Sequence, residues 1–164
     1  MPLLIPALAP LLAASCLLPP VNAPVTDAFR EPSCTWCPGN RGLEYTVPAG
    51  AAVRAAAAGR VTFRGSVAGV LYVVVEHADG LRATYGRLSS TDLSTGSTVT
   101  QGSEVGRSSS ELYFGLRRGD MYVDPAPLLG RLVERWRLVP TDGSLGRRAP
   151  PPRLRCPASL REVG

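Results

Sequence analysis

Histidine is nearly absent from this chain, because His77 is the only one among its 164 residues. One histidine without a cysteine or aspartate cluster beside it does not form a histidine-based metal site, and we expect His77 to be an exposed residue at the end of a hairpin. The sequence also lacks a glycine-rich phosphate loop and a serine-centred nucleophile elbow. Nucleophilic catalysis therefore has no candidate set of residues.

Aromatic residues are also scarce, at 6%, and all 18 positive charges are arginines. The formal net charge is +5, but much of the excess lies near the C-terminus, and no basic run is interleaved with aromatic residues. A nucleic-acid surface would show both features, so we expect no nucleic-acid partner. The chain does contain 17 glycines and 16 prolines among short apolar runs, which favours a β-rich fold.

Residues 1–23 are an apolar leader without a charged residue. Pro6 and Pro10 interrupt the leader, and it is too short for a membrane span, so we predict a secretory signal. The run LLAASC ends on small residues and a cysteine, which makes Cys16 a candidate for the lipidated first residue of a bacterial lipoprotein. A plain signal peptide and an uncleaved anchor are the alternatives. All three predict a secreted or cell-envelope protein that meets a membrane only through this leader.

Three further cysteines follow the leader. Cys34 and Cys37 form a CTWC pair, and in an oxidising compartment such a pair can close a small loop with a disulfide. A zinc knuckle would need a second pair of ligands, and a thioredoxin-like site would need a helix after the motif, where Pro38 and Gly39 stand instead. We therefore predict a structural disulfide. Cys156 could pair with Cys16 if that residue is retained, although connectivity cannot be read from sequence.

The segment 24–133 reads as one domain of short strands. Runs such as LEYTV, GRVTFRGSV, LYVVVEH and ELYFGLR are rich in β-branched and aromatic residues and are separated by glycine and proline turns. HADGLRATYG predicts a hairpin with its turn at Asp79 and Gly80. AAVRAAAAG could be a helix or a strand, and PAPLLGRLVERW predicts one short C-terminal helix. Residues 134–164 form a Pro/Arg-rich tail that we expect to be extended.

Three pieces of this domain, in order and at the right spacing, resemble the LytM or lysostaphin type of zinc endopeptidase, family 23 of the metallopeptidases. The pieces are NRGLEYTVPAGAAVRAAAAGRVTFRG, YVVVEHADGLRATYGRLS and ELYFGLRRGDMYVDPAPLL, so the resemblance runs from about Pro24 to Leu129. It implies an all-β fold with an antiparallel β-sheet core of the duplicated hybrid motif or barrel-sandwich type, and a site at the open face. It also implies action on peptide cross-links of bacterial peptidoglycan.

The family's zinc site is replaced at every position. The resemblance puts the metal ligands at Asn40, Glu44 and Tyr113, and the two assisting histidines at Arg87 and Glu111. An amide oxygen binds zinc poorly, a phenol would have to lose its proton, and a permanent positive charge at Arg87 would oppose a metal. We therefore expect no zinc and no other cofactor, and we expect these five residues to line a groove.

Glu44 and Glu111 could still act as a carboxylate pair in acid and base chemistry on glycans. Nothing else supports that chemistry, and we predict instead that Arg87 forms a buried salt bridge with them that fills the vacated metal pocket. Asp120 and Asp124, in RRGDMYVDP, are expected to be turn and closure residues.

The resemblance and its departures favour a non-catalytic cell-envelope module. Such a module would bind peptidoglycan or, as degenerate members of the family do, activate a separate cell-wall amidase. The alternative is an active zinc-dependent peptidoglycan endopeptidase, in which case zinc would be the cofactor. A third possibility is a purely structural envelope domain.

Overall fold

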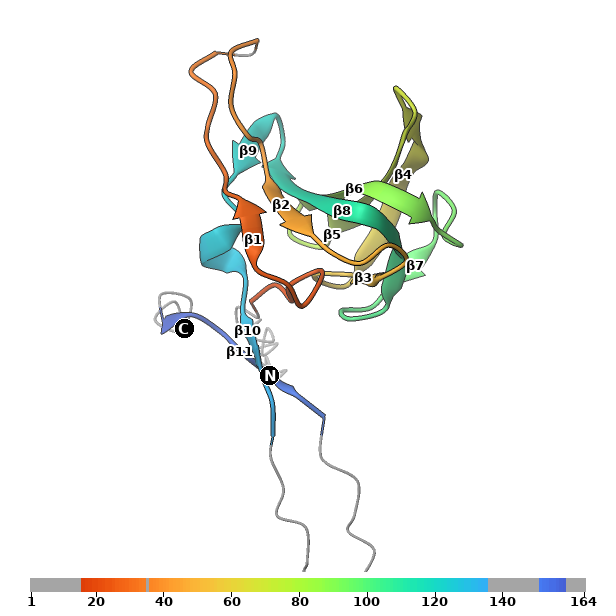
Figure 1. Cartoon of the computed structure of the whole chain (residues 1–164), viewed down its shortest axis with the longest axis vertical. Helices are drawn as coiled ribbons and strands as arrows, with labels where there is room; N and C mark the ends of the chain where they lie inside the picture. The colour runs from red at the N-terminus through yellow and green to blue at the C-terminus, as the bar shows by residue number, and fades with distance from the viewer. Residues whose placement is uncertain (1–15, 35, 136–150, 159–164) are drawn as a thin grey trace, which may run out of the picture.

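The computed structural model describes residues 16–34, 36–135 and 151–158. Its main body is a curved, antiparallel sheet of nine strands, with β1 and β2 towards one side and β4 and β7 towards the other (Figure 1). The strands follow the order β1-β2-β8-β6-β5-β4-β7, and β3 and β9 also pair with β8. Their bounds are β1 Val25–Asp27, β2 Leu43–Thr46, β3 Ala52–Arg54, β4 Gly59–Val67, β5 Val70–His77, β6 Leu81–Ser90, β7 Thr98–Val99, β8 Glu104–Arg118 and β9 Met121–Val123.

The core lies on one face of this sheet, because alternate residues of each strand point to the same side. Tyr85 and Phe114, on the neighbouring strands β6 and β8, are fully buried, with ring centroids 5.4 Å apart. The Tyr85 hydroxyl accepts a hydrogen bond from the Ala56 amide at 2.7 Å, so this buried phenol has a partner. The prediction of an all-β, antiparallel fold is confirmed.

The predicted hairpin at Asp79 and Gly80 is also confirmed. β5 and β6 pair on either side of it, Gly80 has a φ of +77°, and the Asp79 carboxylate accepts a hydrogen bond from the Leu81 amide at 3.1 Å. His77 differs from expectation, because it is only 7% exposed and its Nδ1 lies 2.8 Å from the Ala58 carbonyl oxygen. Gly59 stands opposite His77 without a side chain, which leaves room for the imidazole.

The alanine-rich segment is a strand followed by buried loop. β3 covers Ala52–Arg54, and the next residues, Ala55 and Ala56, are fully buried. Asp120 lies in the turn between β8 and β9, where it pairs with Arg117 at 3.1 Å, and Asp124 accepts a hydrogen bond from the Ala126 amide at 2.9 Å. Both therefore act in turn and closure, as the sequence predicts.

The predicted C-terminal helix is reduced to a single 3-10 turn, η1, at Ala126–Leu128. Leu129 is extended, and strand β10 (Arg131–Val133) follows where the sequence predicts helix. The physical reason is pairing with the N-terminal segment, since Leu17 and Leu129 form a parallel bridge. β10 pairs with β11 (Arg153–Arg155), so part of the tail is ordered in a second, two-stranded sheet.

Two disulfides join the four cysteines. One closes the CTWC loop through Cys34 and Cys37, as predicted, and the other joins Cys16 to Cys156. Cys16 and Val21 are 2% and 8% exposed, so this part of the predicted leader packs into the domain. Among the residues that the structure describes, no helix is both long and apolar enough to cross a membrane.

Candidate functional site

Three neighbouring strands, β2, β8 and β6, bring most of the predicted site residues to one face of the sheet. Glu44 on β2 stands directly opposite Tyr113 on β8, which in turn stands opposite Gly86 on β6. Thr46 stands opposite Glu111 in the same register. Because side chains alternate along a strand, Glu44, Glu111 and Tyr113 all point away from the core face.

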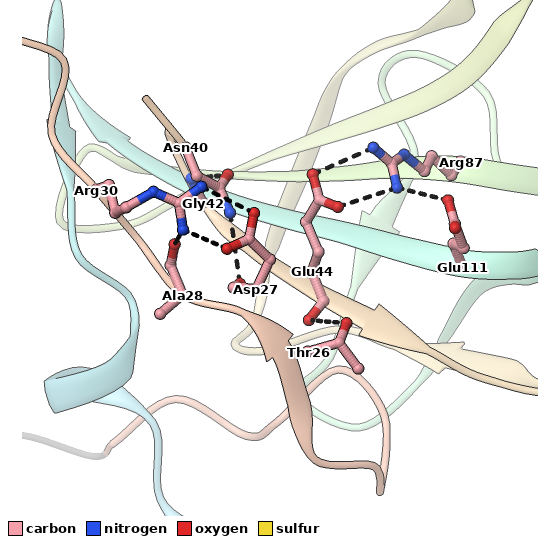
Figure 2. Close-up of polar contacts among 9 residues, drawn as sticks. All are labelled: Thr26, Asp27, Ala28, Arg30, Asn40, Gly42, Glu44, Arg87 and Glu111. Carbon is pink, nitrogen blue, oxygen red and sulfur yellow. Dashed lines mark hydrogen bonds and ion pairs between the residues drawn. The ribbon is translucent and has the colours of Figure 1, made fainter. Parts of the chain in front are cut away.

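Arg87 joins the two glutamates (Figure 2). Its two terminal nitrogens each donate to one oxygen of Glu44 at 3.1 Å, and Nη1 also donates to Glu111 at 2.6 Å. The predicted ion pair is therefore present. It is not buried, however, because the side chains of Arg87, Glu44 and Glu111 are 35%, 28% and 54% exposed. The reason is its place on the outer face of the sheet.

The backbone at Arg87 has an unusual conformation that aims this side chain. Its φ is +62°, in the left-handed region that residues with a side chain seldom adopt. The register between β5 and β6 shifts between Leu71 and Tyr72, whose partners are Leu88 and Gly86, so Arg87 is the extra residue of a β-bulge on β6. A strained backbone that persists in a fold is held by its surroundings, and here the two carboxylates provide that restraint.

Asn40 does not join this cluster. It is 6% exposed, and its Oδ1 accepts a hydrogen bond from the Gly42 amide at 3.2 Å. Its Nδ2 donates to the Asp27 carbonyl oxygen at 3.4 Å, and its backbone pairs with Arg30. Figure 2 shows these contacts as a group separate from Arg87. The amide of Asn40 thus fastens the loop before β2, and it does not line the groove as predicted.

Tyr113 lies against two glycines, Gly115 on its own strand and Gly42 just before β2. A Cβ added at Gly115 would come within 2.6 Å of the Tyr113 hydroxyl, and one at Gly42 within 2.8 Å of the ring. Burial first, and then the phenols of Tyr122 and Tyr72, raise the pKa of Tyr113 to about 12. The hydroxyl therefore stays protonated at neutral pH, which is the wrong state for a metal ligand.

The residues at these positions do not fit zinc. Both oxygens of Glu44 are occupied by the Arg87 guanidinium, the Asn40 amide is used elsewhere, and the Tyr113 phenol is protonated. Zinc in proteins takes imidazole, thiolate or carboxylate ligands. Within the described ranges, no group of three or more histidine, cysteine, aspartate or glutamate side chains could share a metal ion. A glycosidase needs open space for its substrate between two carboxylates, and here Arg87 lies between Glu44 and Glu111.

Sequence reasoning missed a hollow of about 690 Å³ beside the CTWC loop. Trp36, which is 93% exposed, lines it together with Met121 and Tyr122 of β9. The guanidinium carbons of Arg41 and Arg117 lie 5.5 and 5.3 Å from the Tyr122 ring centroid. The sequence signals this hollow only through the CTWC and MY motifs. A tryptophan inside a short disulfide loop cannot reach the core, so it is expected at the surface.

Comparison with known proteins gives a consistent set of relatives. The model of "Peptidase family M23" matches residues 38–125. Murein hydrolase activator EnvC of Escherichia coli is 36% identical over 123 residues, which cover 68% of this chain and 28% of EnvC.

Solved structures agree. Csd3 of Helicobacter pylori superimposes with a TM-score of 0.62 and 28% identity, over 70% of this chain and 33% of Csd3. The catalytic domain of the antimicrobial peptidase lysostaphin from Staphylococcus simulans has a TM-score of 0.58, over 65% of this chain and 91% of that domain. At 18% identity, this last likeness shows the fold alone. The chain spans about a third or less of EnvC and of Csd3.

Proposed function

This chain belongs to peptidase family M23, and from that premise we propose that it is a non-catalytic cell-envelope module that activates a separate cell-wall hydrolase. The family places the chain among LytM-like cell-wall modules. The further step, from a family of peptidases to an activator without its own chemistry, is the proposal. An amidase is the hydrolase that we expect as the partner, outside the cytoplasm.

The observation that carries the proposal is the ion pair among residues that the resemblance assigns to the family's zinc site. A peptidase of this kind needs an open coordination position for a metal-bound water. Here Glu44 and Glu111 bind the Arg87 guanidinium, which under that assignment takes the place of the metal. A groove whose catalytic position is filled in this way can still recognise a binding partner.

The relative EnvC supports the choice of partner, since its name describes an activator of murein hydrolases. Binding to peptidoglycan itself is the second candidate activity, because the resemblance to the LytM or lysostaphin type implies action on that polymer. An active zinc endopeptidase is the third. These three activities differ in what must be present for peptidoglycan to be cut.

The test is a lysis assay with purified peptidoglycan, a cell-wall amidase from the host bacterium and the purified full chain. We expect lysis by the amidase to rise several-fold when the chain is added, and no lysis by the chain alone with or without zinc. Arg87→Ala should lower the activation. The matched control, Arg64→Ala, should not, because Arg64 is an exposed arginine on β4, outside the ion-pair cluster.

Elemental analysis of the purified chain and a pulldown with sacculi complete the test. We expect less than about a tenth of an equivalent of zinc. Near-stoichiometric zinc together with lysis by the chain alone would refute the proposal in favour of an enzyme. Retention on sacculi without any effect on an amidase would refute it in favour of a wall-binding module.

A further inference from the structure

We propose that Cys16 is one half of a disulfide that attaches the C-terminal β-hairpin, formed by β10 and β11, to the domain. Cys16 is therefore not the acylated first residue of a lipoprotein. The Sγ of Cys16 is bonded to that of Cys156, 140 residues away. The lipid of a bacterial lipoprotein is attached to its cysteine through a thioether, which uses the same sulfur atom. One sulfur cannot form both bonds, so the two fates exclude each other.

The surroundings of Cys16 favour the disulfide. The residue is 2% exposed, its amide donates to the Sγ of Cys156 at 3.2 Å, and its carbonyl oxygen accepts a hydrogen bond from Gln101 at 3.2 Å. The next residues continue into the fold: the Leu17 amide donates to Leu128, and the Leu18 amide donates to Ala56. A lipid-bearing residue must reach the membrane surface, and this one would first have to leave the core.

Gly130 provides a second, independent observation. A Cβ added there would lie 2.6 Å from the Sγ of Cys16 and 2.7 Å from a methyl carbon of Leu154 on β11. The Gly130 amide also donates to the Leu17 carbonyl oxygen at 2.8 Å. Gly130 thus has no side chain at the point where the disulfide and the hairpin pack against the backbone. A larger residue there would clash with both.

The hairpin needs such a fastening. β10 and β11 share three residue pairs and stand apart from the main sheet (Figure 1). Two-stranded hairpins are only marginally stable in water by themselves. Cys156 directly follows β11, so the disulfide attaches the free strand of the hairpin to the domain. It follows that any cleavage of the leader that leaves this disulfide intact lies before Cys16.

The bond forms by oxidation of two thiols. Two protons leave, and two electrons pass to the disulfide of an oxidising protein in the extracytoplasmic compartment, which becomes a dithiol. No lipid precursor takes part in this reaction. The inference does not depend on whether the chain activates a hydrolase.

The test uses the full chain, exported in a bacterial host and purified without reductant. Free thiols are blocked with N-ethylmaleimide, and the digest is analysed by mass spectrometry before and after reduction. We expect one peptide pair that joins Cys16 to Cys156 and separates on reduction. We also expect no incorporation of labelled fatty acid and no change in processing with an inhibitor of the lipoprotein signal peptidase. A diacylglycerol mass on the Cys16 peptide, with Cys156 blocked by maleimide, would overturn the proposal.

Single variants test the fastening itself. Cys16→Ser and Cys156→Ser should each lower Tm by about 10 °C, because the loop that this disulfide closes is long. The double variant should show no further loss, because both residues belong to the same bond. The matched control removes the other disulfide with Cys34→Ser and Cys37→Ser, and it should cost less because that loop is only a few residues long. Additive effects of Cys16→Ser and Cys156→Ser would contradict the assignment.

Discussion

Replacing Arg87 tests both its ion pairs and its backbone. In Arg87→Ala the cation is lost, and Glu44 and Glu111 are left facing each other, because both bind the same nitrogen at 3.1 and 2.6 Å. Two carboxylates within about 6 Å of each other repel by about 1 to 3 kcal/mol, less whatever solvent screening removes at these exposed side chains. We expect Arg87→Ala to lower the free energy of unfolding by about 1 to 2 kcal/mol.

A second variant separates charge from conformation. Arg87→Gly removes the same charge but accepts the φ of +62° without strain, so it should be more stable than Arg87→Ala by about 1 kcal/mol. Urea unfolding of the wild type and both variants measures these differences. Equal stability of the alanine and glycine variants would refute the role given to the left-handed backbone.

Salt dependence tests whether charge explains this cost. Added salt screens the repulsion between exposed carboxylates, so the cost of Arg87→Ala should shrink as the ionic strength rises. A cost that is unchanged between low and high salt would mean that lost packing, and not charge, explains the variant.

Three further predictions concern the same face of the sheet. Combining Asn40→His, Glu44→Asp and Tyr113→His with Arg87→His should raise bound zinc from below about a tenth towards one equivalent, measured by elemental analysis, whereas the triple variant that keeps Arg87 should stay near the lower value. Tyr113, with its pKa raised to about 12, should ionise late in an ultraviolet titration, and the late step should be smaller in Tyr113→Phe. Because the unfolded phenol ionises near pH 10, the stability that this group contributes is complete below pH 10 and is lost as pH rises towards 12. Gly42→Ala should destabilise the fold by about 1 to 3 kcal/mol, since the new Cβ would meet the Phe114 carbonyl oxygen at 2.5 Å and the Tyr113 ring at 2.8 Å. Thermal unfolding that matches the wild type would show that the strands can separate there at little cost.

The fold was largely predictable from local patterns. Alternating β-branched and apolar residues predicted the strands, and the Asp79-Gly80 turn predicted the central hairpin, because both signals act over a few residues. The family pattern predicted that Arg87, Glu44 and Glu111 would meet. It failed at Asn40, whose side chain turns away from this cluster and donates to the Asp27 carbonyl oxygen.

The rest depended on contacts between distant segments. Leu17 and Leu129 pair across more than a hundred residues, and that pairing turned a predicted helix into a 3-10 turn and a strand. The hydrophobic pattern of neither segment indicates that it pairs with the other. The prediction that His77 is exposed was wrong for a similar reason. The burial of its imidazole depends on the absence of a side chain at Gly59, on another strand.

The cation at the centre of this face is part of the polypeptide. A bound metal ion exchanges with its surroundings, so the shape of a metal site varies with the supply of the ion and with chelators. Arg87 is carried by β6 and is synthesised with the protein, in fixed ratio to Glu44 and Glu111. A surface built in this way keeps the same form in metal-poor and metal-rich surroundings, and a partner that recognises it would meet the same contour in both.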